Sequence, residues 1–377
     1  MKKTSFLSTI LKNTPYLLPY GQAIADYRIG MSTNETGHML WDAISHGANR
    51  ADLITLLQTT YDISASDLPD LEQDVDTFLS TLQTNAILEN TTSELCRFPK
   101  SYIKIGPVTC CMQLPTGIIQ EFFEAFCVEP GSTMQNICFY PYLPSNRPNG
   151  MVLVRNEDML IMETDDWFIF LPQKSTFVYE LHVSKDTSKA NIYSKLDEQN
   201  SLCYHEIFHM LRFAFVMIAQ KNGLLVVHSA SILHNNQAWL FSGHSGAGKS
   251  THTNLWHQEF NTLILNGDLN MIGIEQNKAI CYGLPWCGTS NIFTTKSHPL
   301  GGIVYLKKAL ENKVLEIPAD KEQLYLLERL ISPSWTKEQF ESNIMLTNDI
   351  VNLIRSFQLF CTKDTEAAYV MRSAIES

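Results

Sequence analysis

The chain has 377 residues, of which 45% are apolar and 18% are charged. This length allows two or three domains with their own cores, and the composition excludes a disordered or fibrous protein. The formal net charge of −11 argues against nucleic-acid binding, which needs clustered lysine and arginine side chains. We therefore expect an acidic cytoplasmic protein that binds neither nucleic acid nor a membrane.

The nine cysteines are odd in number and include no CxxC pair. They indicate neither a four-ligand zinc site nor a disulfide framework, so we expect reduced thiols that are mostly buried. The first dozen residues contain three lysines but no continuous apolar core, so they do not form a signal peptide. The most apolar stretch, residues 207–219, is too short to span a bilayer and predicts a core helix.

The first predicted unit comprises residues 15–90. Residues 16–30 favour two short strands, because Pro19 and Gly21 mark a turn or a sheet edge between them. The rest of the unit shows the periodicity of helices, with apolar residues three and four positions apart and acidic residues between them. Two strands followed by helices are the outline of a winged-helix unit.

Three helices are predicted in this unit. The first has Asn34 as its N-cap, and Gly47 ends it in the position that favours a left-handed residue. A second, short helix contains residues 53–57, which are mostly apolar. The third helix opens with Asp67 and Pro69 and carries its apolar residues on one face, with acidic residues on the other.

Three stretches of this unit resemble the PqqD family of peptide-chaperone domains. They are NETGHMLWDAI (34–44), DLITLLQTTYDIS (52–64) and DVDTFLSTLQTNAIL (74–88). Members of that family recognise the leader of a ribosomally made precursor peptide by adding it as a strand to a sheet edge, where unpaired backbone groups are available. The resemblance implies a precursor peptide as partner. The alternative is a DNA-binding winged helix, against which the scarcity of basic side chains on the helices argues.

A polar break at residues 90–94 predicts a linker after this unit. From residue 95 to residue 195 short apolar runs alternate with turn clusters, and residues 156–158 predict a hairpin turn. This β-rich segment contains no motif that indicates chemistry. We expect it to frame the core that follows.

The strongest signal in the sequence fits the phosphate-loop pattern GxxxxGK[ST] in every fixed position. A predicted strand enters the loop and a predicted helix leaves it, so backbone N–H groups and the helix N-terminus can face phosphates. Lys249 is placed to reach the β- and γ-phosphates of ATP, and Ser250 is placed to hold Mg²⁺. The residues of the motif are Gly243, His244, Ser245, Gly246, Ala247, Gly248, Lys249, Ser250 and Thr251.

The flanks of this loop resemble the HPr kinase and PEP-carboxykinase-like group. LLVVHSASI precedes the loop and contains His228, and LILNGDLNMI follows it and contains Asp268. The resemblance extends over residues 95–375, and its specific part is residues 224–312. It is closest to the HPr-kinase homologues found beside peptide-modification genes, and it implies an ATP-dependent kinase that uses Mg²⁺.

Together the two resemblances predict an α/β (α+β) fold with two domains. Residues 1–92 are the PqqD-like leader-binding domain with a winged-helix-like fold, and residues 93–377 are the HPr kinase-like domain. Within the second domain, residues 93–220 are the β-rich framing segment and residues 221–377 the nucleotide-binding core. We expect a mixed sheet in the core, because the strands on either side of Asn235-Asn236 have the pattern of a hairpin.

The kinase resemblance also implies site residues. His228 matches the strand histidine that lies close to the transferred phosphate, and Asp268 matches the second of a pair of aspartates. The first of that pair, the usual general base, is Gly267 in this chain. Asp268 is then left to hold the metal, to activate the hydroxyl, or both, or else the base role passes to His228. The predicted catalytic residues are His228, Asp268 and Lys249, and the predicted metal ligands are Ser250 and Asp268.

Other residues near the loop leave alternatives open. The segment GLPWCG, residues 283–288, is either a tight loop near the nucleotide or acceptor peptide, or a buried structural turn. His244 and His252 lie within or just after the phosphate loop, and we expect them to be solvated histidines at a helix start.

One motif points to different chemistry. His205, Glu206 and His209 match the HExxH pattern of zinc proteases, with both histidines on one helix face. A catalytic zinc needs a third ligand, and the next glutamate, Glu259, lies beyond the phosphate loop. We therefore expect a core helix with two incidental histidines.

Three functions are consistent with these patterns. The first is a kinase that phosphorylates a serine or threonine of a precursor peptide, with the leader-bound peptide raised in effective concentration at the site. The second is a non-catalytic, nucleotide-binding leader-peptide chaperone, which Gly267 favours. The third keeps the kinase but changes the acceptor to a small molecule or a folded protein, and the peptide-binding unit argues against it. A Gly267→Asp substitution is expected to separate the first two.

Overall fold

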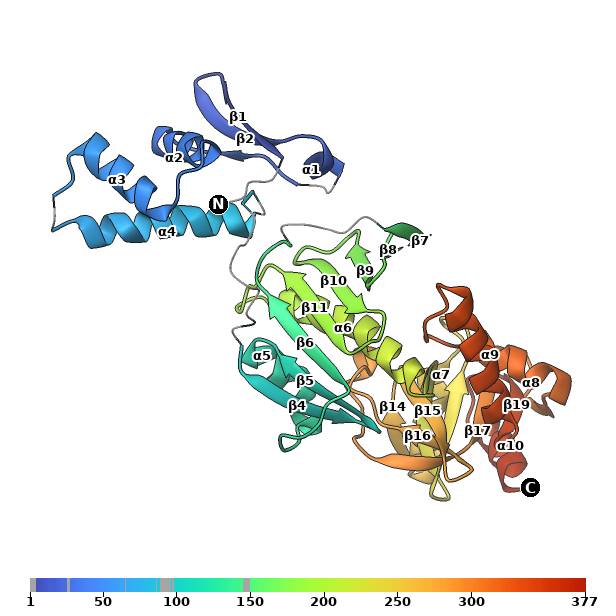
Figure 1. Cartoon of the computed structure of the whole chain (residues 1–377). Coiled ribbons are helices and arrows are strands. Elements are labelled where there is room, and N and C mark those ends of the chain that lie inside the picture. Colours follow the sequence, from blue (N-terminus) through green and yellow to red (C-terminus); the bar gives the residue numbers. More distant parts are fainter. Residues whose placement is uncertain are drawn as a thin grey trace.

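The computed structural model shows a small N-terminal unit and a larger α/β part built on two eight-stranded sheets (Figure 1). The predicted fold class, with a mixed-sheet core, is confirmed. The predicted linker at residues 90–94 lies outside the described residues. The structure describes residues 5–25, 28–64, 66–85, 87–88, 96, 98–144 and 150–377.

The N-terminal unit begins with a three-stranded antiparallel sheet in the order β1-β2-β3. The prediction of two strands within residues 16–30 was wrong, because an earlier strand pairs with the first of them and the following segment forms a short helix. Lys12 and Asn13, with φ of 49° and 65°, make the left-handed hairpin turn, which lacks the glycine that marks such turns in a sequence. The bounds are β1 (Phe6–Leu11), β2 (Thr14–Pro19), α1 (Gln22–Ala25) and β3 (Met31–Ser32).

Three helices follow the sheet, as predicted. The Oδ1 atom of Asn34 accepts the N–H of Gly37 at 2.7 Å, which confirms the predicted N-cap. Gly47 follows the first helix with φ of 99°, the left-handed conformation expected of it. The helices bury a common core around Trp41. Their bounds are α2 (Glu35–Ser45), α3 (Arg50–Tyr61) and α4 (Leu68–Thr84).

The first large sheet has the strand order β4-β5-β6-β11-β10-β9-β8-β7. The predicted hairpin turn at residues 156–158 is confirmed, and the Oδ1 atom of Asn156 accepts the N–H groups of Asp158 and Met159. The strands are β4 (Lys100–Ile105), β5 (Val108–Gln113), β6 (Gln135–Tyr140), β7 (Met151–Arg155), β8 (Met159–Glu163), β9 (Trp167–Pro172), β10 (Val178–Ser184) and β11 (Lys189–Ser194). Helical turns α5 (Thr116–Ile118), η1 (Ile119–Phe123) and η2 (Glu124–Phe126) connect β5 to β6.

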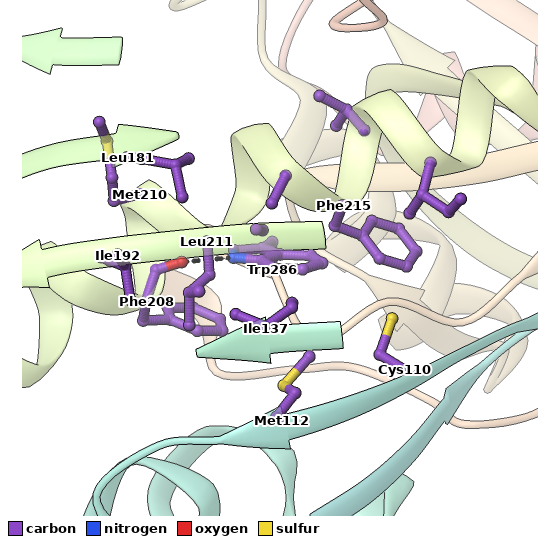
Figure 2. Packing of buried hydrophobic residues seen from close by; sticks show 14 of the residues in the cluster. Cys110, Met112, Ile137, Leu181, Ile192, Phe208, Met210, Leu211, Phe215 and Trp286 are labelled. Carbon is purple, nitrogen blue, oxygen red and sulfur yellow. Dashed lines mark hydrogen bonds between the residues drawn. The ribbon is translucent and has the colours of Figure 1, made fainter. Parts of the chain in front are cut away.

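Helix α6 (Ser201–Lys221) packs against one face of this sheet and forms the centre of the largest core. Figure 2 shows side chains of β5, β6, β10 and β11 meeting Phe208, Leu211 and Phe215 of the helix. Within the described chain, α6 alone is long and apolar enough to cross a membrane, but 61% of its apolar window is buried inside the protein. This burial agrees with the core helix predicted at residues 207–219.

The second large sheet is mixed, because β17 runs parallel to β13 and β19 while the other pairs are antiparallel. Asn235 and Asn236, with φ of 50° and 60°, make the predicted hairpin turn between β12 and β13. The strands are β12 (Leu225–His234), β13 (Gln237–Ser242), β14 (Leu263–Asn266), β15 (Leu269–Glu275), β16 (Lys278–Tyr282), β17 (Ser297–Lys308), β18 (Lys313–Glu316) and β19 (Arg355–Cys361). The helices are α7 (Lys249–Phe260), η3 (Gly288–Ser290), α8 (Ala319–Leu327), α9 (Lys337–Val351) and α10 (Glu366–Glu376).

Two long strands of this sheet change partners along their length. Residues 225–228 of β12 pair with β15, and residues 229–234 pair with β13. The first residues of β17 pair with β16, and residues 300–305 pair with β13. The pairings β13-β12-β15-β16-β17-β13 therefore close on themselves. The change of partner in β12 brings the end of β13 next to the start of β15.

Candidate functional site

The glycine-rich loop of residues 243–248 joins the end of β13 to the start of α7. Gly246 and Gly248 have φ of 74° and 105°, which side chains other than glycine rarely adopt. Gly248 is the N-cap of α7, so the loop leads directly into the first turn of the helix, which begins at Lys249. The backbone conformation thus depends on the glycines of the motif.

The N–H groups of this loop are largely unused. The N–H of Ala247 donates to the carbonyl of His244 at 3.0 Å, which is the loop's own turn. Within the described chain, no hydrogen bond engages the N–H groups of Ser245, Gly246, Gly248, Lys249, Ser250 or Thr251. Free N–H groups at the start of a twelve-residue helix are the arrangement that binds phosphate.

Lys249 lies half-buried beside these N–H groups. Its Nζ atom is 3.5 Å from the carbonyl oxygen of Gly243. Burial lowers the pKa of Lys249, the Asp268 carboxylate partly opposes this effect, and the Arg329 guanidinium adds to it. A negatively charged ligand in the loop would stabilise the charged form of this lysine.

His228 and Asp268 lie together at the point where β12 changes partners. Their Nε2 and Oδ1 atoms are 3.3 Å apart. The interaction with His228 lowers the pKa of Asp268, burial opposes it, and the charges of Arg212 and Lys249 lower it further. Asp268 is therefore an ionised carboxylate at neutral pH, surrounded by cationic groups.

Backbone hydrogen bonds hold the segments of the site in place. The N–H of His228 donates to the carbonyl of Arg329, and the N–H of Ser229 donates to the carbonyl of Asp268, both at 2.9 Å. The Ser242 hydroxyl, at the start of the loop, donates to the carbonyl of His228 at 2.8 Å. Strand β12 thus joins the loop, the carboxylate and the segment after α8 into one rigid arrangement.

Two arginines that the sequence did not single out for the site belong to it. Arg329 follows α8, and its Nη1 and Nη2 atoms lie 3.3 and 3.1 Å from the ring nitrogens of His244 in the loop. Arg212 comes from α6, and its guanidinium makes no hydrogen bond within the described chain. Burial lowers the pKa of Arg212, and the charge of Asp268 raises it. The β-rich framing segment predicted at residues 93–220 therefore also supplies a positive charge, that of Arg212, which lowers the pKa of Asp268.

The structure explains why Gly267 carries no side chain. A Cβ atom at this position would lie 2.2 Å from Oγ and 2.6 Å from Cβ of Ser290. The Ser290 hydroxyl is held there, because it donates to the carbonyl of Cys287 at 2.7 Å. The Gly267→Asp substitution therefore does not simply add a base, since it would first displace the turn that contains Ser290.

Residues 283–287 of the GLPWCG segment are buried, and Gly288, which is exposed, touches Asp268. The indole N–H of Trp286 donates to the carbonyl of Phe208 at 3.0 Å, inside the core shown in Figure 2. Gly288 has φ of 62°, and a Cβ atom there would lie 2.9 Å from Cβ of Asp268. Trp286 thus anchors a buried structural turn, the second alternative left open by the sequence, and Gly288 packs on Asp268; a place near the nucleotide or acceptor peptide stays a prediction.

The glutamate of the HExxH pattern has a structural role in the fold. The rings of His205 and His209 lie 6.4 Å apart between centroids. The Glu206 carboxylate is engaged elsewhere, where it accepts the N–H groups of Thr176 and Phe177 at 3.0 and 2.9 Å. Among the residues described, no group of three or more metal-ligating side chains occurs. The geometry agrees with incidental histidines on a core helix.

The expectation of a solvated His252 was wrong. Its side chain is buried, with 2% exposure, and burial lowers its pKa to about 4. The first turn of α7 places this ring inward, against the N-cap residue Gly248, where the pattern of the loop alone gave no sign of burial. His244 is exposed, as expected, but it is paired with Arg329.

Comparisons with known proteins identify the N-terminal unit. The family model for coenzyme PQQ synthesis protein D (PqqD) matches residues 26–88, which are therefore a PqqD domain. Among curated proteins, none matches this chain. One similar solved structure is the Hpr(Ser) kinase/phosphatase from Coxiella burnetii, with 11% identity and a TM-score of 0.24 over 40% of this chain and 95% of that chain.

Proposed function

We propose that this protein, which carries a PqqD domain, is an ATP-dependent kinase of the HPr-kinase type. Its substrate is a serine or threonine of a ribosomally synthesised precursor peptide, held through its leader by residues 1–92. The kinase domain comprises residues 93–377. The observation that carries the proposal is the glycine-rich loop with free N–H groups, next to the ionised Asp268 and His228.

The loop and Lys249 fit the β- and γ-phosphates of a nucleoside triphosphate. Six unused N–H groups, the positive end of α7 and the ammonium group all favour negative charge at one point. Arg329, Arg212 and His228 extend this positive region toward Asp268. Kinases depend mainly on such positioning and charge neutralisation, because the transferred phosphoryl group is weakly bonded in the transition state.

Ser250 and Asp268 fit a Mg²⁺ ion bound to the nucleotide. Mg²⁺ prefers oxygen ligands and keeps several of its waters, so a hydroxyl, a carboxylate and phosphate oxygens are a suitable set. The Ser250 side chain is exposed and makes no hydrogen bond within the described chain, and Asp268 is ionised. When bound, the ion supplies charge neutralisation on the β- and γ-phosphates.

The reaction needs one proton acceptor near the peptide hydroxyl. The hydroxyl oxygen forms a bond to the γ-phosphorus while the bond to the β–γ bridging oxygen breaks, and ADP leaves. Asp268 accepts the hydroxyl proton, and His228, 3.3 Å away, holds the carboxylate in position. Ser290, close to Gly267, occupies the space in which a second carboxylate would lie.

The leader is proposed to add as a strand to the N-terminal sheet. Both outer strands, β1 and β3, have an edge without a strand partner in the described chain. Such an edge offers backbone groups to an extended peptide. Leader binding raises the concentration of the acceptor at the kinase site without new contacts there. A cytoplasmic location, where ATP and newly made peptides are both present, suits this function.

The second candidate is a leader-peptide chaperone whose nucleotide site transfers no phosphate. Gly267 and the packing of Ser290 on it favour this candidate, because the site has one carboxylate where two are usual for the resembled kinases. The Gly267→Asp/Ser290→Gly double variant tests it better than the single one, since glycine at 290 removes the two closest contacts with the new side chain and leaves only the Cys287 carbonyl oxygen, 3.2 Å from its Cβ. Transfer that rises in the double variant would identify a competent site that lacks its base.

The decisive experiment is mass spectrometry of a precursor peptide incubated with the protein, ATP and Mg²⁺. We expect the gain of phosphate on a serine or threonine, its loss in Lys249→Ala, and its retention in the control Lys321→Ala on α8. A peptide without its leader is expected to be a poor substrate. Tight leader binding with no mass change would refute the kinase and support the chaperone.

A further inference from the structure

A pocket of about 460 Å³ opens beside the glycine-rich loop, on the side away from the carboxylate site. One wall is the loop and the first turn of α7, and the other is the ends of β17 and β19. His228 and Asp268 do not line it, although both lie close to Lys249, which does. The volume falls within the range of small-molecule sites.

Two lysines give this pocket its charge. Lys308 is the last residue of β17, and Lys363 follows β19. The two strands are parallel, with Lys308 paired to Cys361, so their ends meet at the same edge of the sheet. Both lysine side chains are exposed, and none of the lining residues is acidic. The outer wall is therefore positively charged.

Two backbone donors of this wall, the N–H groups of Ala309 and Thr362, are already used. The N–H of Ala309 donates to the carbonyl of Cys361 at 3.0 Å. The Asn312 Oδ1 atom accepts the N–H of Thr362 at 2.9 Å and its hydroxyl at 3.2 Å. These bonds make the wall rigid but leave few fixed donors to read the edge of a base.

His252 closes the inner end of the pocket as an uncharged side chain. Its Cδ2 and Nε2 atoms face Gly248, 3.6 and 4.0 Å from the Cβ position of that glycine. The Nδ1 atom is buried and has no hydrogen-bond partner in the described chain. A neutral ring at this place offers a contact surface to a sugar or base but does not add to the attraction for phosphate.

We propose that this pocket takes the nucleoside end of the nucleotide, with Lys308 and Lys363 contacting the α-phosphate and ribose. The inference rests on the proposed function, because it assigns the orientation of a nucleoside triphosphate on the loop. The γ-phosphate then points toward Asp268, and the base lies between the loop and the ends of β17 and β19. The two lysines recognise charge, so the site selects phosphates. Because the N–H groups of Ala309 and Thr362 are already bonded, few donors remain to distinguish one base from another, and the site discriminates weakly among bases.

The test compares the binding of ATP, GTP, CTP and inorganic tripolyphosphate to the full chain by calorimetry. Wild-type protein is expected to bind the three nucleotides within about fivefold of one another and tighter than tripolyphosphate. The Lys308→Ala/Lys363→Ala variant is expected to lose about tenfold in nucleotide affinity, as removal of two exposed charge contacts allows, and little in tripolyphosphate affinity. The control Lys321→Ala/Lys337→Ala, on α8 and α9, removes the same charge elsewhere and is expected to match wild type.

Other results overturn the inference in distinguishable ways. If tripolyphosphate binds as tightly as ATP, the loop binds phosphates but the pocket does not contact the nucleoside, and the inference is wrong. Equal losses for nucleotide and tripolyphosphate in the lysine variant would place the lysines on the β- or γ-phosphate. A preference for one base of thirtyfold or more, by calorimetry, would show that the wall reads the base. Binding of neither ligand would overturn the proposed function together with this inference.

Discussion

Gly267→Ala is expected to destabilise the fold by displacing the turn that packs on Asp268. The new Cβ atom would lie 2.2 Å from the Ser290 hydroxyl oxygen and 3.2 Å from the Cys287 carbonyl oxygen. The hydroxyl cannot stay, because it is held by a bond to that carbonyl and accepts the N–H of Ile292. The backbone at Gly267 has no positive φ, so alanine itself introduces no conformational strain there.

The magnitude follows from what the displacement breaks. Two side-chain hydrogen bonds of Ser290 contribute about 1 kcal/mol each, and the overpacked turn adds roughly 1–2 kcal/mol. We expect the free energy of unfolding to fall by about 3–4 kcal/mol, measured by urea denaturation. Ser290→Gly alone removes the same bonds and is expected to cost about 1–2 kcal/mol.

A double-mutant cycle makes this prediction specific. In Gly267→Ala/Ser290→Gly the two clashes with Ser290 are gone and only the 3.2 Å approach to the Cys287 carbonyl oxygen remains, so the double variant is expected to be more stable than Gly267→Ala alone. Gly131→Ala is the matched control, because its Cβ would approach no atom closer than 4.0 Å, and it is expected to change stability by less than about 0.5 kcal/mol. Additive effects in the cycle, or a Gly267→Ala variant as stable as the control, would refute the steric argument.

Two further predictions concern the charges of the site. The pKa of Asp268 is lowered in the folded protein, so this carboxylate stabilises the fold above its ordinary pKa of 3.8, and the stabilisation is lost as the pH falls through the lowered pKa. Asp268→Asn is therefore expected to be less stable than wild type at pH 7. At pH 3 the two proteins are expected to differ less in their free energy of unfolding. Arg212→Met removes a half-buried charge whose guanidinium makes no hydrogen bond within the described chain, so its stability is expected to stay the same or rise while phosphoryl transfer falls about a hundredfold. A variant that unfolds readily but keeps its activity would contradict this role.

Local signals predicted the parts of the fold that depend on a few neighbouring residues. Asn34 caps α2 because a short side-chain oxygen can reach the N–H of Gly37 three residues later. The Asn235-Asn236 turn forms because asparagine tolerates the left-handed conformation that a hairpin needs. The Lys12-Asn13 turn uses the same conformation but has one asparagine and no glycine, and β1 escaped prediction.

The site residues that escaped prediction are those that reach it through tertiary packing. Arg212 appears in the sequence as an interruption of an apolar helix, and only the packing of α6 against β12 brings its charge into the field of Asp268. Arg329 carries no motif, and it reaches the loop because its carbonyl accepts a bond from β12. The crowding of Gly267 by Ser290 joins residues from two segments whose contact no local pattern encodes.

The two strands that change partners also limit how the site can open. Residues of β12 and β17 belong to both parts of the closed set of pairings, so no flexible joint separates the side that carries Asp268 from the side that carries the loop. Hinge closure needs a few backbone positions free to rotate between two bodies, and a continuous strand provides none. If the proposed function holds, the nucleotide and the peptide are therefore expected to bind without a hinge motion between these two sides.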